Sequence, residues 1–116
     1  ERKQFGKAIC NFQAVQFMLA DMAMETEAAR QLYLHCAQLM DAGQPYTMEA
    51  AMAKTKGSDV SVKAALDGLQ VMGGYGYMRE YPMEKLVRDS KILQIYEGTN
   101  QIQRSVIANQ LLKKIK

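Results

Sequence analysis

Apolar side chains recur every three or four residues along the first third of the chain. The repeat runs from about Asn11 to Asp41 and follows the 3.6-residue period of a helix. The stripe consists of Phe12, Val15, Leu19, Met22, Thr26, Ala29, Tyr33, Cys36 and Met40. It predicts one long amphipathic helix that packs through this seam, with Asn11 as its N-cap and with Gly43 and Pro45 ending it.

A second helix is expected from Thr47 to the glycine pair at 73–74, with Thr47 as its cap. Its seam is Met48, Met52, Thr55, Asp59, Val62, Leu66 and Leu69. Asp59 interrupts the apolar row, and Gly57 costs about 1 kcal/mol relative to alanine in a helix interior. We expect Gly57 to permit close helix packing and Asp59 to pair with a basic side chain, in preference to a functional role for either.

Two shorter helices complete the pattern. Pro82 suits the first position of a third helix. The apolar side of that helix is Met83, Leu86, Val87 and Ile92. After a break at 95–99, a fourth helix is expected from about Asn100 to the end, with two apolar faces that each imply a partner. No stretch alternates as a strand does. The pattern predicts one all-α domain over residues 1–116, an up-down-up-down four-helix bundle.

Composition narrows the class of protein. The 116 residues are 48% hydrophobic and 23% charged, which is a globular balance. The net charge of +3 includes one short basic run at 113–116, so nucleic acid is a poor candidate partner. No apolar run approaches the roughly 20 residues that span a membrane, and no signal peptide is visible. The chain opens on Glu1 without an initiator methionine, so we expect a fragment of something longer.

Metal and nucleophile chemistry find no support. Cys10 and Cys36 have no metal-ligand spacing, and His35 is the single histidine. Two unpaired thiols favour a reducing compartment, either a bacterial-type cytoplasm or, in a eukaryote, the mitochondrial matrix. No serine or cysteine has a histidine at a suggestive position, which argues against nucleophilic catalysis.

Glycines and methionines leave alternatives open. The glycines of 73–76 lack the spacing and the preceding strand of a dinucleotide fingerprint. They could end a helix, or they could let a flat or phosphorylated ligand lie against bare backbone. Four methionines fall on the two seams and are expected in the core: Met22, Met40, Met48 and Met52. Three others fall off the seams and could form a second buried surface, most simply a subunit interface: Met18, Met24 and Met78.

Glu97 stands directly before Gly98, where the fourth helix is expected to begin. A base that must reach a substrate carbon needs such a place, and glycine lets another molecule approach the backbone. Most Glu-Gly pairs are solvated turns, so spacing alone leaves both interpretations open.

Several longer motifs occur in order along the chain. They are RKQFGK at 2–7, FQAVQ at 12–16, LADM at 19–22, EAAR at 27–30, QVMGGYGY at 70–77, EYP at 80–82, RDSKI at 88–92 and IYEGTNQIQR at 95–104. Together they resemble the C-terminal helical domain of the acyl-CoA dehydrogenases, and the resemblance covers essentially all 116 residues.

The resemblance implies an FAD-dependent oxidoreductase. Family members oxidise acyl-CoA thioesters to trans-2-enoyl-CoA and pass electrons to an electron-transfer flavoprotein. By resemblance Glu97 is the base that takes the proton beside the thioester carbonyl. Homo-oligomers, dimers or tetramers, are expected, in which part of this domain contacts the FAD of a neighbouring subunit.

The remaining site residues also come from the resemblance. Gly98 and Asn109 are expected to contact substrate. The expected FAD contacts are Arg2, Gln4, Gln13, Gln70, Gly73, Gly74, Thr99 and Gln101. Two departures stand out: the family commonly has arginine in place of Asn109, and residues 54–59 are more polar than usual.

The family's N-terminal helical domain and middle β domain are absent from this chain, so we expect the fragment alone to be inactive. Two alternatives remain. One is a non-catalytic helical module for oligomerisation or interaction. The other is an acyl-CoA oxidase-type flavoprotein, which shares the fold.

Overall fold

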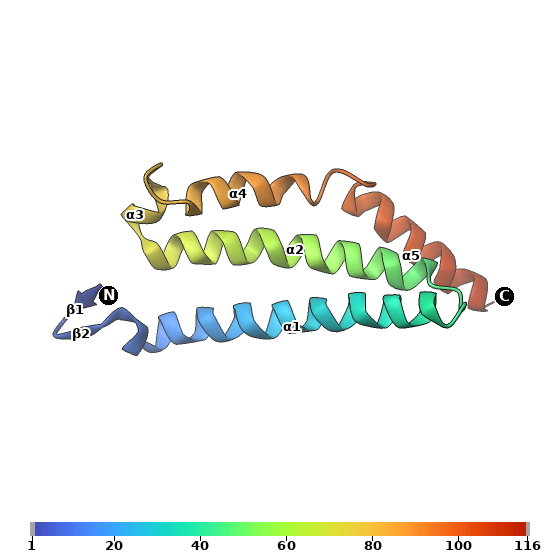
Figure 1. Ribbon diagram of the computed structural model, residues 1–116, viewed down its shortest axis with the longest axis horizontal. Helices are drawn as coiled ribbons and strands as arrows, with labels where there is room; N and C mark the ends of the chain where they lie inside the picture. The colour runs from blue at the N-terminus through green and yellow to red at the C-terminus, as the bar shows by residue number, and fades with distance from the viewer. Residues whose placement is uncertain (1, 116) are drawn as a thin grey trace.

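A computed structural model describes residues 2–115, and Glu1 and Lys116, the last lysine of the basic run, lie outside them. Two long helices dominate the elongated molecule, which measures 61 × 25 × 25 Å. Helix α1 (Gln13–Asp41) and helix α2 (Thr47–Met72) run antiparallel, side by side (Figure 1). A turn (Gly74–Tyr77, α3) and helix α4 (Met83–Ile92) lead to helix α5 (Asn100–Ile115).

Helix α2 is the central element. It packs against α1 on one side and against both α4 and α5 on the other. In Figure 1, α4 and α5 follow one another along α2, and both run in the direction of α1. The all-α class is confirmed. A strict up-down-up-down order is not shown, because α5 continues in the direction of α4 and does not reverse it.

A small hairpin precedes the helices. Strands β1 (Lys3–Gln4) and β2 (Lys7–Ala8) pair antiparallel, and a 3₁₀ turn (Ile9–Asn11, η1) leads to α1. Phe5 and Gly6 form the hairpin turn with φ of 52° and 78°, the left-handed values that tight hairpins require. The expectation of no strand was therefore wrong here, because two-residue strands are too short to show alternation.

The predicted helix ends are close, but their caps differ. Asn11 lies in η1, and Phe12 takes the N-cap position of α1 without a side-chain cap. Thr47 is the first residue of α2 and caps nothing, while Pro82 is the N-cap of α4. Gly43 has φ of 66°, as expected for a left-handed helix exit.

The predicted seam of α1 is correct at about half of its positions. Phe12, Val15, Met22, Ala29 and Cys36 are partly buried as predicted. The intervening seam positions are exposed instead: Leu19, Thr26, Tyr33 and Met40. Their places on the packed face are taken by Met18, Glu25, Leu32 and Leu39. Met18 therefore belongs to the α1 packing face, whereas Met24 and Met78 remain exposed.

The two irregularities of α2 have different outcomes. A Cβ atom at Gly57 would meet no atom within 4 Å, so close packing there was wrong. The close approach occurs at Gly68, where a Cβ would lie 2.9 Å from the Met83 Cε atom. The predicted basic partner of Asp59 is confirmed, because Arg104 Nη2 lies 2.9 Å from Asp59 Oδ2.

The buried residues are small and partly polar. Among residues 2–115, those that are buried are Ala51, Thr55, Ser58, Val60, Ala65, Gly76, Ser90 and Asn100. Large apolar side chains of α5, such as Ile102 and Leu112, are more than half exposed. Exposed apolar side chains that gather on one surface are typical of sites where another protein surface binds.

Candidate functional site

The loop between α4 and α5 has an unusual backbone. Glu97 has φ of 54° and Gly98 has φ of 85°, so two successive residues are left-handed. For glycine this is costless, but for a residue with a Cβ it costs roughly 1–2 kcal/mol. The Glu97 side chain is exposed. Such a conformation persists only where neighbouring groups hold it.

Side chains hold the carbonyl groups of this loop. Gln103 Nε2 donates to the Glu97 carbonyl at 2.9 Å, and Lys54 Nζ donates to the Gly98 carbonyl at 2.7 Å. The Thr99 hydroxyl accepts from the backbone N–H of Ile102 at 3.3 Å, which caps the first turn of α5. The loop is therefore tied to its own helix and to α2.

Asn100, directly after the loop, is the most buried polar residue near it, at 3% exposure. Its Nδ2 donates to Ser58 Oγ at 2.8 Å and to Asp59 Oδ1 at 2.7 Å. Its Oδ1 accepts from Lys54 Nζ at 2.7 Å. Every polar atom of the buried amide is thus paired, as burial demands.

Asp59 is the hub of this network. Besides Asn100 and Arg104, it accepts from Gln94 Nε2 at 2.7 Å. Partial burial by itself would raise the pKa of Asp59, but hydrogen bonds from Gln94, Asn100 and Arg104, with the Arg104 charge, together lower it below its ordinary value. Asp59 is therefore held as a carboxylate.

A second set of predicted site residues lies at the other end of α2. Arg2, Gln4, Gln70 and Gly73 line one groove of about 390 Å³ between the hairpin and α2. Gly73 has φ of 61° and ψ of −141°, a conformation essentially reserved for glycine. A Cβ there would lie 3.4 Å from Arg2 Nη1, so the arginine passes close to bare backbone.

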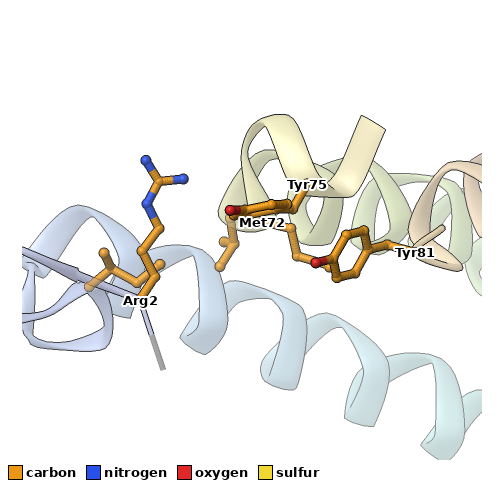
Figure 2. A pocket seen from close by; sticks show the side chains of 6 residues that line it. Arg2, Met72, Tyr75 and Tyr81 are labelled. Carbon is orange, nitrogen blue, oxygen red and sulfur yellow. The ribbon is translucent and has the colours of Figure 1, made fainter. Parts of the chain in front are cut away.

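A larger hollow of about 790 Å³ adjoins this groove and shares Arg2, Ile9 and Val71 with it. Figure 2 shows the Arg2 guanidinium on one side of the hollow and the rings of Tyr75 and Tyr81 on the other. The two rings lie 5.3 Å apart between centroids. We call the groove and the hollow together the Arg2 groove. It offers a cation, aromatic faces and glycine backbone, the features that suit a phosphate-bearing aromatic ligand.

The structure does not unite all predicted residues. We call residues 93–99, between α4 and α5, the Glu97 loop. Lys54 contacts this loop from α2, and Gly73 directly follows α2. The two residues are 19 positions apart, which is about 28 Å at roughly 1.5 Å per residue. Gln13 and Gly74 are exposed and line neither part of the Arg2 groove. Asn109 is exposed on α5, ten positions after Thr99 and so about 15 Å along the helix. Gln101 lies beside the loop, in the first turn of α5.

Sequence reasoning missed the residues that hold the loop: Lys54, Ser58, Asn100 and Gln103. The sequence carries one signal for them, because residues 54–59 are more polar than is usual in the family. This polarity is explained by the contacts of Lys54, Ser58 and Asp59 with the loop and α5.

In residues 2–115, no three His, Cys, Asp or Glu side chains are grouped so as to hold a metal ion. Within that same range, no helix combines the length and apolar character needed to cross a membrane.

Known proteins share both the sequence and the fold. Residues 1–112 match the family model of the acyl-CoA dehydrogenase C-terminal domain. A probable acyl-CoA dehydrogenase of Bacillus subtilis, YngJ, is 54% identical over 113 residues, which are 97% of this chain and 30% of that protein. The chain therefore belongs to the acyl-CoA dehydrogenase family and corresponds to its C-terminal domain.

Two solved structures are similar throughout the chain. Butyryl-CoA dehydrogenase from Megasphaera elsdenii is 48% identical with a TM-score of 0.94, over 97% of this chain and 29% of that one. A chain in the structure of the electron transferring flavoprotein of Acidaminococcus fermentans is 53% identical with a TM-score of 0.93, over 96% and 29% of the two chains. This chain thus spans about 30% of the length of its curated relatives.

Proposed function

We propose that this chain is the C-terminal part of an FAD-dependent acyl-CoA dehydrogenase, with Glu97 as the base. The observation that carries the proposal is the conformation of the Glu97 loop. In this chain Glu97, whose carboxylate is exposed, and Gly98 are two successive left-handed residues just before the start of α5.

Glu97 takes the proton from the carbon beside the thioester carbonyl of an acyl-CoA. That carbon is too weakly acidic for a carboxylate in water, so the rest of the protein must close over the loop and remove water from Glu97. The backbone N–H of Glu97 is suited to donate to the thioester oxygen and to stabilise the charge that develops there. Gly98 leaves room for the substrate, and Asn109 further along α5 is proposed to contact it.

FAD, when bound, would supply the acceptor for the hydride that leaves the next carbon. Thr99 and Gln101 are proposed to contact the cofactor beside the Glu97 loop. The Arg2 groove is proposed to hold part of a second FAD, bound by a neighbouring subunit, through Arg2, Gln4, Gln70 and Gly73. Gln13 and Gly74, which do not line the groove, are proposed to contact the same cofactor from outside it. The roughly 28 Å between the two regions supports two cofactor contacts per chain, and therefore a homo-oligomer.

The electron acceptor is proposed to be an electron-transfer flavoprotein, which the similar chain in the Acidaminococcus fermentans structure supports. The reducing compartment expected from the sequence is part of the same proposal. The isolated chain should be inactive because the acyl and flavin pockets need the remaining two thirds of the protein.

A non-catalytic helical module is the second candidate. The exposed apolar side chains of α5 favour it, since they require a covering partner whatever the chemistry. A pure scaffold, however, gives no reason for the left-handed Glu97 or for Arg2 beside Gly73.

The test uses the full-length protein that carries this chain. Its visible spectrum should be that of a flavoprotein, and anaerobic addition of acyl-CoA should bleach the flavin. Glu97→Gln should lower the bleaching rate at least about a hundredfold, the smaller end of what general base catalysis contributes. Equal bleaching in both proteins would remove Glu97 as the base. Rapid reoxidation of the reduced flavin by oxygen would instead identify the oxidase-type alternative.

A further inference from the structure

We propose that Asp59 and Lys54 are positioning residues that hold the Glu97 loop in the shape required for proton removal. The inference rests on the proposed role of Glu97 as the base. Neither side chain is placed in the reaction itself. Asp59 acts through the side chains of Gln94 and Asn100, which flank the loop, and Lys54 acts through the Gly98 carbonyl.

The first step is the closure of the loop ends. The backbone N–H of Asn100 donates to the carbonyl of Gln94 at 3.0 Å, so residues 95–99 form a closed loop. The same oxygen of Asp59, Oδ1, accepts from the Gln94 side chain and from the Asn100 side chain, each at 2.7 Å. One carboxylate oxygen on α2 therefore holds the entry and the exit of the loop together.

The other oxygen of Asp59 extends the contact into α5. Its Oδ2 accepts from Arg104 Nη2 at 2.9 Å, and Arg104 Nη1 in turn donates to the Asn100 carbonyl at 3.2 Å. The first turn of α5 thus cannot rotate without breaking a charge-assisted hydrogen bond. The direction of this helix sets where the loop begins and ends.

Lys54 acts on the interior of the loop. Its ammonium donates to the Gly98 carbonyl and to Asn100 Oδ1, both at 2.7 Å. The Gly98 carbonyl belongs to the residue directly after Glu97, so this contact fixes the Gly98–Thr99 peptide plane, one residue beyond the base. Because Lys54 and Asp59 are both on α2, their contacts fix the position of the loop relative to this long helix.

A loop with a left-handed Glu97 has lower-energy shapes available when these contacts weaken. Moving to one of them would displace the carboxylate. A misplacement of about 1 Å in an active site can cost on the order of a hundredfold in rate. The contacts therefore matter for the position of Glu97 as well as for the stability of α5.

The experiment compares Asp59→Asn with Asp67→Asn in the full-length flavoprotein. Asp67 lies on the same helix and pairs with the mostly exposed Lys63, away from the loop, so it is a matched control. The measurements are FAD content, KM, the anaerobic flavin reduction rate, and the isotope effect for substrate deuterated beside the thioester carbonyl. Asp59→Asn should retain FAD, change KM less than about threefold, slow reduction about tenfold to a hundredfold and enlarge the isotope effect. Asp67→Asn should match the unmodified protein.

A second pair of variants serves if Asp59→Asn does not fold. Lys54→Met removes the donor to the Gly98 carbonyl, and Lys54→Arg keeps a cationic donor. Lys54→Met should show the same slow reduction with retained FAD, and Lys54→Arg should recover a large part of the rate.

The outcomes separate this inference from the proposed function. If Glu97→Gln reduces flavin normally, the base assignment fails and this inference fails with it. If Glu97→Gln is inactive while Asp59→Asn and Lys54→Met reduce flavin as fast as Asp67→Asn, only the positioning role is overturned. A loss of activity in strict proportion to lost FAD, with an unchanged rate per flavin, also overturns it.

Discussion

The Glu97 loop and the Arg2 groove lie on the same central helix and are built in opposite ways. The loop is tied by side chains to α2 and α5, and two residues of the network that holds it, Ser58 and Asn100, are buried. The Arg2 groove is wide and shallow, and its arginine and hairpin are exposed. A group that carries out chemistry must be held within fractions of an ångström, whereas a groove that receives a ligand can be completed by the ligand and by another subunit.

The two regions also differ in how far residues of this chain alone hold them in place. The backbone of the loop needs no group from outside the chain, since its carbonyl partners come from Lys54 and Gln103. In residues 2–115 no side-chain hydrogen bond joins the two walls of the groove, and Arg2 Nη1 would lie 3.4 Å from a Cβ at Gly73. We therefore expect substitutions in the two regions to separate into effects on rate and effects on cofactor retention.

Gly98→Ala should change the conformation of the Glu97 loop and leave the Arg2 groove unchanged. A Cβ at Gly98 would lie 2.8 Å from Gln103 Nε2, and the residue would keep a left-handed φ of 85°. The Gln103 amide would move and release the Glu97 carbonyl. We expect flavin reduction in the full-length protein to slow about tenfold to a hundredfold, through strain of order 1–3 kcal/mol and misplacement of the base.

Gly43→Ala is the control for this substitution. Gly43 has a similar φ of 66° but lies between α1 and α2, far along the chain from the loop, with open space around its Cβ. It should lower thermal stability without changing the reduction rate per flavin. An equal slowing in both variants would show that general loss of stability, and not the loop, controls the rate.

Arg2→Ala should weaken cofactor binding in the Arg2 groove and leave the conformation of the Glu97 loop unchanged. If Arg2 faces a cofactor phosphate, its loss removes a charge-assisted contact worth about 1.5–3 kcal/mol, which corresponds to roughly tenfold or more in FAD affinity. The measurement is FAD release during dilution at several salt concentrations, with Arg30→Ala as control. Arg30 is an exposed arginine of α1 paired with Glu27. Retained FAD in Arg2→Ala would place the phosphate contact elsewhere.

The sequence predicted the groove residues and the loop residues through motifs, and it predicted helix boundaries through glycine and proline. It predicted the α1 face less well. Glu25 lies on the packed face because it forms an ion pair with Lys56 of α2. The apolar repeat of α1 gave no reason to place this charged residue on the seam. Tyr33 and Met40 are apolar but exposed, since among the described residues the main packing partner of α1 is a single long helix, α2.

The contacts that hold the loop were beyond reach of the sequence for a different reason. Lys54 and Gly98 are 44 positions apart, and Ser58 and Asn100 are 42 apart. Such pairs can be predicted only when it is known that α5 packs on α2 and does not return beside α4. Local periodicity does not contain that choice.

Acid should loosen the loop before the groove, which is the smallest effect we predict. The pKa of Asp59 is lowered from an ordinary value of 3.8. A carboxyl group with a lowered pKa in the folded state adds stability above its ordinary pKa and loses that contribution as the pH falls through the lower, folded value. Because the Asp59 side chain is 39% exposed, the contribution is modest.

The difference in thermal midpoint between the unmodified protein and Asp59→Asn should therefore be largest near neutral pH and should shrink below about pH 4. Asp67→Asn should change the midpoint less, because the Lys63 side chain that pairs with it is mostly exposed and ion pairs with exposed partners contribute little. A difference that stayed constant down to about pH 2 would mean that shape, and not the charge of Asp59, supports the start of α5. In that case Asn at position 59 would lower stability at every pH, and the network would depend on the packing of Ser58 and Asn100.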